Sequence, residues 1–167
     1  MKILGLITTA AALLPLPVMA QAACFARTYS AEHLQANPGQ QVSQIRALHV
    51  PSAGDMPESY DMRLLFRDDS REFSATPFCD DIDGETNCMI ECDGGIIRPA
   101  MDEAGSLRLS TDYLRAETSA PTALESEGGC VEPVVRSIAD LAPSGASIET
   151  VFILHPQEPG VCDWARR

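Results

Sequence analysis

The sequence predicts a mainly β domain, either an antiparallel up-and-down barrel of the calycin type or a sandwich, stapled by disulfides and with a short N-terminal helix. Three observations support this fold class. Apolar and polar residues alternate over short runs, turn-forming residues separate these runs, and all six cysteines lie beyond an apolar leader. Short strands punctuated by turns are typical of sandwiches and barrels.

Residues 1–22 predict an export signal. Lys2 supplies the positive start, residues 3–18 are apolar, and Ala20-Gln21-Ala22 is a small-x-small cleavage site. We expect cleavage near Ala22/Ala23, with the bond after Ala20 as an alternative. The apolar run is too short and too interrupted by proline for a membrane span, which needs about 20 apolar residues.

Residues 23–167 are then expected to form a single β domain. About 145 residues is the size of one ordinary domain, so the chain can bury a core and its disulfides are a reinforcement. Cysteine thiols oxidise outside the cytosol, and we therefore expect a periplasmic or secreted, disulfide-bonded protein.

The first predicted element is a helix over residues 31–36. Ser30 is a suitable N-cap, and Asn37-Pro38-Gly39 predicts the end of the helix. Strand-like runs follow, and the clearest is residues 60–66, where alternate apolar positions predict a half-buried strand. The other runs lie at 41–50, 71–76, 87–92, 96–98, 107–109, 113–116 and 150–154.

Residues 134–141 are ambiguous. Pro133 at a first helical position, with Val134, Ile138 and Leu141 at near-helical spacing, favours a short helix. Val134 and Val135 by themselves favour a strand.

One disulfide follows from turn chemistry. Asp83-Gly84 is a strong signal for a two-residue hairpin turn, because glycine tolerates the positive φ of a type I′ turn. Counting outward from that turn places Cys79 opposite Cys88 in a non-hydrogen-bonded pair, where Cα atoms are about 4.5 Å apart and a disulfide can form. We predict that Cys79 pairs with Cys88.

The other four cysteines permit more than one pairing. A strand that continues beyond Cys88 would point Cys92 inward, toward a partner from elsewhere in the chain. Cys24 with Cys162 and Cys92 with Cys130 is one arrangement; Cys24 with Cys92 and Cys130 with Cys162 is nearly as good. The spacing matches neither a zinc knuckle nor a thioredoxin-like motif, so disulfides are the expected role.

The carboxylates around the predicted hairpin are a weak Ca²⁺ candidate. They are Asp80, Asp81, Asp83 and Glu85. Carboxylate oxygens suit Ca²⁺, but the EF-hand template fails here because Ile90 occupies the position of its bidentate acid. A solvated acidic tip is the better interpretation.

The sequence lacks the common signatures of catalysis. His33, His49 and His155 are too far apart in sequence for a close-spaced metal motif. No nucleophile elbow, Walker motif or dinucleotide fingerprint occurs, and Lys2 is the only lysine. Enzyme is therefore the minority interpretation, and no cofactor is expected. Most of the aromatic residues are expected in the core.

The chain is acidic, with a formal charge of −12 that becomes −13 without Lys2. Such a surface repels nucleic acid and anionic membranes and attracts basic proteins or cations.

Several segments resemble a family of small exported bacterial proteins of uncharacterised function. They are residues 24–29, His33-Leu34, Pro38-Gly39-Gln40 and residues 88–95. The resemblance implies an exported, mostly β domain and supplies no catalytic residues. A looser likeness, in compartment, charge and fold class, is to acidic periplasmic lysozyme inhibitors.

We therefore predict a non-enzymatic periplasmic or secreted binding protein whose acidic surface recognises a basic protein or a cationic ligand. The alternatives are an inhibitor of a basic hydrolase of the lysozyme type, a small hydrolase with an acid pair or a histidine, and a Ca²⁺-stabilised structural module.

Overall fold

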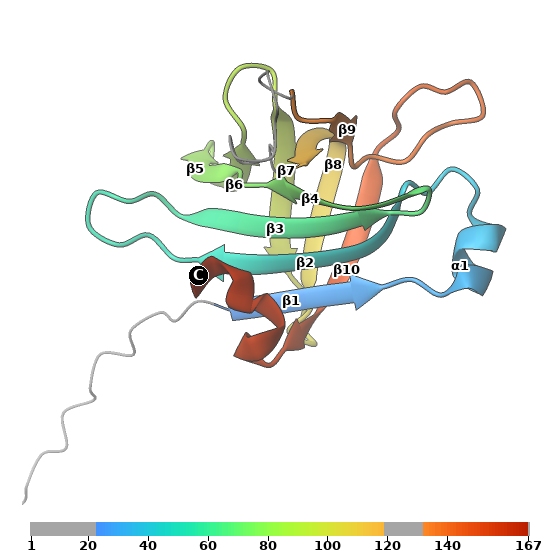
Figure 1. The fold of residues 1–167 in the computed structure, drawn as a ribbon. Coiled ribbons are helices and arrows are strands. Elements are labelled where there is room, and N and C mark those ends of the chain that lie inside the picture. Colours follow the sequence, from blue (N-terminus) through green and yellow to red (C-terminus); the bar gives the residue numbers. More distant parts are fainter. Residues whose placement is uncertain (1–22, 119–131, 167) are drawn as a thin grey trace, which may run out of the picture.

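A computed structural model of the chain describes residues 23–118 and 132–166. The predicted export signal and Cys130 lie outside the described residues. The described residues are mainly β, with ten antiparallel strands in one sheet that closes in a ring (Figure 1). The strands are β1 (Ala23–Thr28), β2 (Val42–Val50), β3 (Ser59–Phe66), β4 (Asp69–Ala75), β5 (Phe78–Ile82), β6 (Glu85–Met89), β7 (Gly95–Met101), β8 (Leu107–Thr118), β9 (Val135–Ser137) and β10 (Thr150–Gln157).

The strand order combines two meanders instead of following one up-and-down order. Strands β1 to β4 are sequential neighbours, as are β5 to β8, but β4 pairs with β8. Strand β10 pairs with both β1 and β8 and closes the ring. Twelve residues make β8 long enough to pair with β7 and β10 over its first two thirds and with β9 and β4 near its end. Figure 1 shows β1 to β4 running across β7, β8 and β10.

The core fills the space between these two sets of strands. The alternation predicted over residues 60–66 is confirmed, because Tyr60, Met62, Leu64 and Phe66 are all buried. Phe73 from β4 is fully buried, and its ring meets Phe66 edge-on with ring centroids 4.7 Å apart. Side chains from both sets of strands therefore form one hydrophobic cluster.

The predicted N-terminal helix is present as α1 (Ala31–Ala36). The Ser30 hydroxyl accepts a hydrogen bond from the His33 backbone N–H at 3.1 Å, which is the N-cap contact expected of serine. The helix ends at Asn37, as the Asn-Pro-Gly sequence predicts.

The helix favoured for residues 134–141 is wrong, and the segment contains β9 instead. The Val134 carbonyl accepts from the Thr118 N–H at 3.0 Å, and the Ile138 N–H donates to the Leu114 carbonyl at 3.0 Å. The end of β8 offers unpaired backbone groups here, so the β-branched residues complete the sheet.

The two ends of the described chain are joined covalently. A disulfide links Cys24 in β1 to Cys162 in η1 (Pro159–Arg166), a 3₁₀ segment that lies against β1 and β2. The Trp164 indole N–H donates to an Asp61 carboxylate oxygen at 3.1 Å, and the Arg46 guanidinium lies 4.8 Å from its ring centroid. Because Cys24 is bonded to Cys162, its alternative pairing with Cys92 is excluded.

No helix in the described ranges is long and apolar enough to cross a membrane.

Candidate functional site

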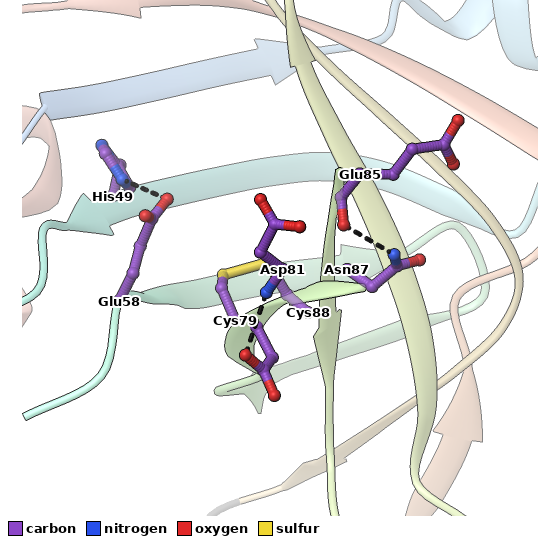
Figure 2. The surroundings of a disulfide bond; sticks show 8 residues. His49, Glu58, Cys79, Asp81, Glu85, Asn87 and Cys88 are labelled. Carbon is purple, nitrogen blue, oxygen red and sulfur yellow. Dashed lines mark hydrogen bonds and ion pairs between the residues drawn. A yellow bond between two sulfur atoms is a disulfide. The ribbon is translucent and has the colours of Figure 1, made fainter. Parts of the chain in front are cut away.

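The predicted hairpin is present, with the expected register. Strands β5 and β6 are joined by Asp83 and Gly84, whose φ values of 57° and 80° are those of a two-residue type I′ turn. Cys79 lies opposite Cys88, and their sulfur atoms form a disulfide. Figure 2 shows this bond with Asp81, Glu85 and Asn87 around it.

Cys92 does not point inward as predicted. Strand β6 ends at Met89, and the chain then turns through Cys92 and Asp93, whose φ values are 57° and 62°. The Ile90 N–H donates to the Gly95 carbonyl at 3.1 Å, which holds the turn and leads the chain into β7. The Cys92 side chain is exposed and its thiol is free among the described residues. Cys130, one of its expected partners, lies outside them. The two disulfides that do form indicate an oxidising environment.

The hairpin and the turn after it carry negative charge only. Residues 78–95 contain six carboxylates and no lysine, arginine or histidine. They are Asp80, Asp81, Asp83, Glu85, Glu91 and Asp93, all of them exposed. Within the described part of the chain, none of the six forms an ion pair. Their field is therefore directed toward solvent and toward any charged partner.

The Ca²⁺ candidates do not gather into a cation site. One Asp80 carboxylate oxygen accepts from the Asp81 N–H at 2.9 Å, and one from Asp81 accepts from the Gly84 N–H at 2.9 Å. These two carboxylates therefore cap the backbone of the turn. Across the described residues, no group of three or more His, Cys, Asp or Glu side chains is arranged to hold a metal ion.

An apolar groove lies beside this acidic hairpin. Phe78 and Met89 are cross-strand neighbours, and the two residues are 49% and 38% exposed. With Pro57 they line an open groove of about 620 Å³, whose other lining residues are Cys79, Asp80 and Glu91. Phe78 was expected in the core and is instead exposed. Alternation alone does not show which face of a strand is covered.

His49 and Glu58 form a histidine–carboxylate pair beside the hairpin. Nε2 of His49 lies 2.9 Å from a carboxylate oxygen of Glu58, and the imidazole stacks on Tyr60 with ring centroids 5.0 Å apart (Figure 2 shows the His49–Glu58 contact). Burial, together with the charge of Glu58, raises the pKa of Tyr60 to about 12. Neither His49 nor Glu58 lines the groove. Their contact links β2 to the residue that precedes β3.

The other two histidines have separate partners. Nε2 of His33 lies 2.9 Å from the Gln40 side-chain oxygen, and the His33 ring stacks on Tyr29 with centroids 4.9 Å apart. Nδ1 of His155 lies 3.4 Å from the Ser106 hydroxyl. The three histidines thus do not share a site.

Comparisons with family models, curated proteins and solved structures found no match to this chain. The resemblance to small exported bacterial proteins stays a prediction.

Proposed function

We propose that this protein is a non-enzymatic binding protein of the periplasm or extracellular space, and that its acidic hairpin recognises a basic protein. The observation that carries the proposal is the composition of one surface. The hairpin segment carries six carboxylates and no cationic side chain, and two of the six, Asp80 and Glu91, line an exposed apolar groove.

The two parts of this surface would have different roles. The carboxylates attract a basic partner electrostatically, and salt screens this attraction. The Debye length, over which the attraction acts, is about 8 Å at physiological ionic strength. Phe78 and Met89 offer apolar area for the stems of lysine and arginine side chains or for an apolar anchor. The disulfide between Cys79 and Cys88 keeps the hairpin in one shape, so less conformational entropy is lost on binding.

Inhibition of a basic hydrolase would be a special case of this function. A basic lysozyme is therefore the most informative probe, with cytochrome c as a basic protein of different shape. Binding of both proteins in proportion to their charge would indicate general recognition of cations. Binding of lysozyme together with loss of its activity would indicate an inhibitor.

The test measures affinity for these two probes at low and high salt. One variant neutralises the hairpin by Asp80→Asn, Asp81→Asn, Asp83→Asn and Glu85→Gln, which retain the oxygen acceptors that cap the turn. A control variant removes four exposed carboxylates elsewhere by Glu103→Gln, Asp112→Asn, Glu149→Gln and Glu158→Gln. Both variants have the same net charge, so any difference between them reports position.

We expect the hairpin variant to bind roughly tenfold more weakly than the control variant, a change of about 1.4 kcal/mol. We expect the difference to shrink at high salt, as it does for exposed charges. Equal weakening in the two variants, or no binding of either probe to the unmodified protein, would contradict the proposal.

A further inference from the structure

The outer face of strands β7, β8 and β10 is exposed to solvent, and Figure 1 shows these strands side by side. Six residues lie there in two adjacent rows across the sheet: Arg98, Ser110 and Val151 in one row, and Ala100, Arg108 and Ile153 in the next. All of them except Ser110 are exposed, whereas Leu109 and Phe152, which alternate with them along β8 and β10, are buried. The six residues therefore share one surface, which we call the arginine face.

The two charged residues of the arginine face are free to meet a partner. Among the described residues, the guanidinium groups of Arg98 and Arg108 form no ion pair, hydrogen bond or cation–π contact. Asp112, farther along β8, is exposed and forms no ion pair with them. Other guanidinium groups are already held in ion pairs, namely those of Arg46, Arg63, Arg71, Arg115 and Arg136.

The hairpin carries a surface of opposite charge. Phe78, Asp80 and Ile82 alternate along β5, and Met89 and Glu85 lie opposite Phe78 and Ile82 on β6. These five residues therefore share one face of the hairpin, and all five are exposed. This face combines two carboxylates with three apolar side chains. The arginine face likewise combines two guanidinium groups with the apolar side chains of its β10 residues.

The charges on the two surfaces have the same spacing. Arg98 lies opposite Ser110, which is two residues from Arg108, so the two arginines are diagonal neighbours on adjacent strands. Asp80 and Glu85 are diagonal neighbours across β5 and β6 in the same way. Diagonal neighbours in an antiparallel pair are about 7 to 8 Å apart. Two guanidinium groups can therefore meet two carboxylates at once, each in a charge-assisted hydrogen-bonded pair.

We infer that the hairpin of one copy of this chain docks on the arginine face of a second copy. The two arginines pair with Asp80 and Glu85, and the apolar residues of the two surfaces cover one another. The net charge of −12 opposes association at long range, but salt screens this repulsion beyond about 8 Å at physiological ionic strength. The inference shares the hairpin with the proposed function but does not rest on it, because it needs no second kind of protein.

The two surfaces are different parts of the chain, so the contact is heterologous. One copy can bind a neighbour through its hairpin and another through its arginine face, and such contacts produce rings or open chains of copies. This property distinguishes the inferred contact from a symmetric dimer, in which the same surface is used twice.

The test is sedimentation equilibrium of the protein at physiological ionic strength, between about 10 µM and about 1 mM of chain. Every sample is first treated with iodoacetamide, so that the free thiol of Cys92 cannot link two copies. We expect a series of oligomers, the dimer and larger species, whose share rises with concentration. A protein that stays monomeric over this range would overturn the inference.

Two variants each block one of the two surfaces. The face variant is Arg98→Gln with Arg108→Gln, and the hairpin variant is the one with four substitutions described above. Each should associate with itself at least roughly tenfold more weakly than the unmodified protein does. The hairpin variant carries less negative charge, so repulsion between whole molecules by itself predicts the opposite change.

A matched control removes the same charge as the face variant. It is Arg71→Gln with Arg136→Gln, whose guanidinium groups are already paired with Asp69 and Asp68. This control should associate as the unmodified protein does. If it loses association as the face variant does, then net charge governs the effect and the inference is wrong.

A mixture of the two blocked variants gives the sharpest result. The face variant still has its hairpin and the hairpin variant still has its arginine face, so an equimolar mixture should form a dimer and no larger species. A mixture that stays monomeric would overturn the inference. The face variant should bind the lysozyme probe as the unmodified protein does, because its hairpin is intact, and this separates the result from that of the proposed function.

Discussion

Tyr60 lies near the start of β3, where the residue is only 5% exposed and the His49 ring stacks on its ring. Its position follows directly from the alternation in residues 60–66. Burial makes the ring a good core residue, but the same burial disfavours the negative charge of a tyrosinate.

We predict that Tyr60→Phe extends the stability of the protein at alkaline pH. The folded-state pKa of Tyr60 is about 12, against an ordinary value of 10.0. The stabilising effect of this shift is therefore fully present below pH 10 and is lost as the pH rises through 12. Denaturant unfolding at about pH 9 and about pH 11 would measure it. Phenylalanine should retain more of its stability than tyrosine does over that interval, and an equal loss in both proteins would contradict the prediction.

The hairpin of β5 and β6 is the element whose geometry could be predicted most completely. Asp83 and Gly84 set the turn, the turn sets the register, and the register places Cys79 opposite Cys88. Each step is local, so no knowledge of the rest of the fold is needed.

Removing this disulfide should lower stability without unfolding the protein. The closed loop spans ten residues, because the sequence separation is 9, and the chain-entropy model assigns it about 2.7 kcal/mol. Cys79→Ala combined with Cys88→Ala should therefore lower the free energy of unfolding by up to that amount. Its circular dichroism spectrum should stay unchanged. A loss well above this amount would mean that the hairpin supports other parts of the core.

Other elements could not be predicted, for physical reasons that differ from case to case. Residues 134–138 join the sheet because β8 has unpaired backbone groups at its end, which a helical spacing pattern does not reveal. Cys92 is exposed because the chain leaves β6 at Met89, three residues earlier than the apolar run indicated. The backbone hydrogen bond from the Leu141 N–H to the Gly39 carbonyl joins residues about 100 positions apart, and such a contact has no local signal in the sequence.

The whole molecule depends on long-range strand pairing to close its ring. The strands at the two ends of the described chain, β1 and β10, pair with each other, and β10 then pairs with β8. The disulfide between Cys24 and Cys162 strengthens this closure, because it ties β1 to the segment that follows β10. The acidic charge of −12 opposes it only weakly, since exposed charges are screened by salt.

Loss of the Cys24–Cys162 bond should cost more than loss of the hairpin disulfide. The sequence separation is 138, and the chain-entropy model assigns a loop of this length about 5 kcal/mol at most. Cys24→Ala combined with Cys162→Ala should therefore unfold at a lower denaturant concentration than the Cys79 and Cys88 double variant. The reverse order would show that native contacts, and not loop length, govern the two effects.

The disulfide between Cys24 and Cys162 closes a covalent ring, which runs along the backbone from Cys24 to Cys162 and back through the two sulfur atoms. A protease that cuts one peptide bond in a loop between these residues opens the ring but releases no fragment, because the disulfide still joins the two pieces. On an electrophoretic gel the nicked protein would run as one species until a reductant is added.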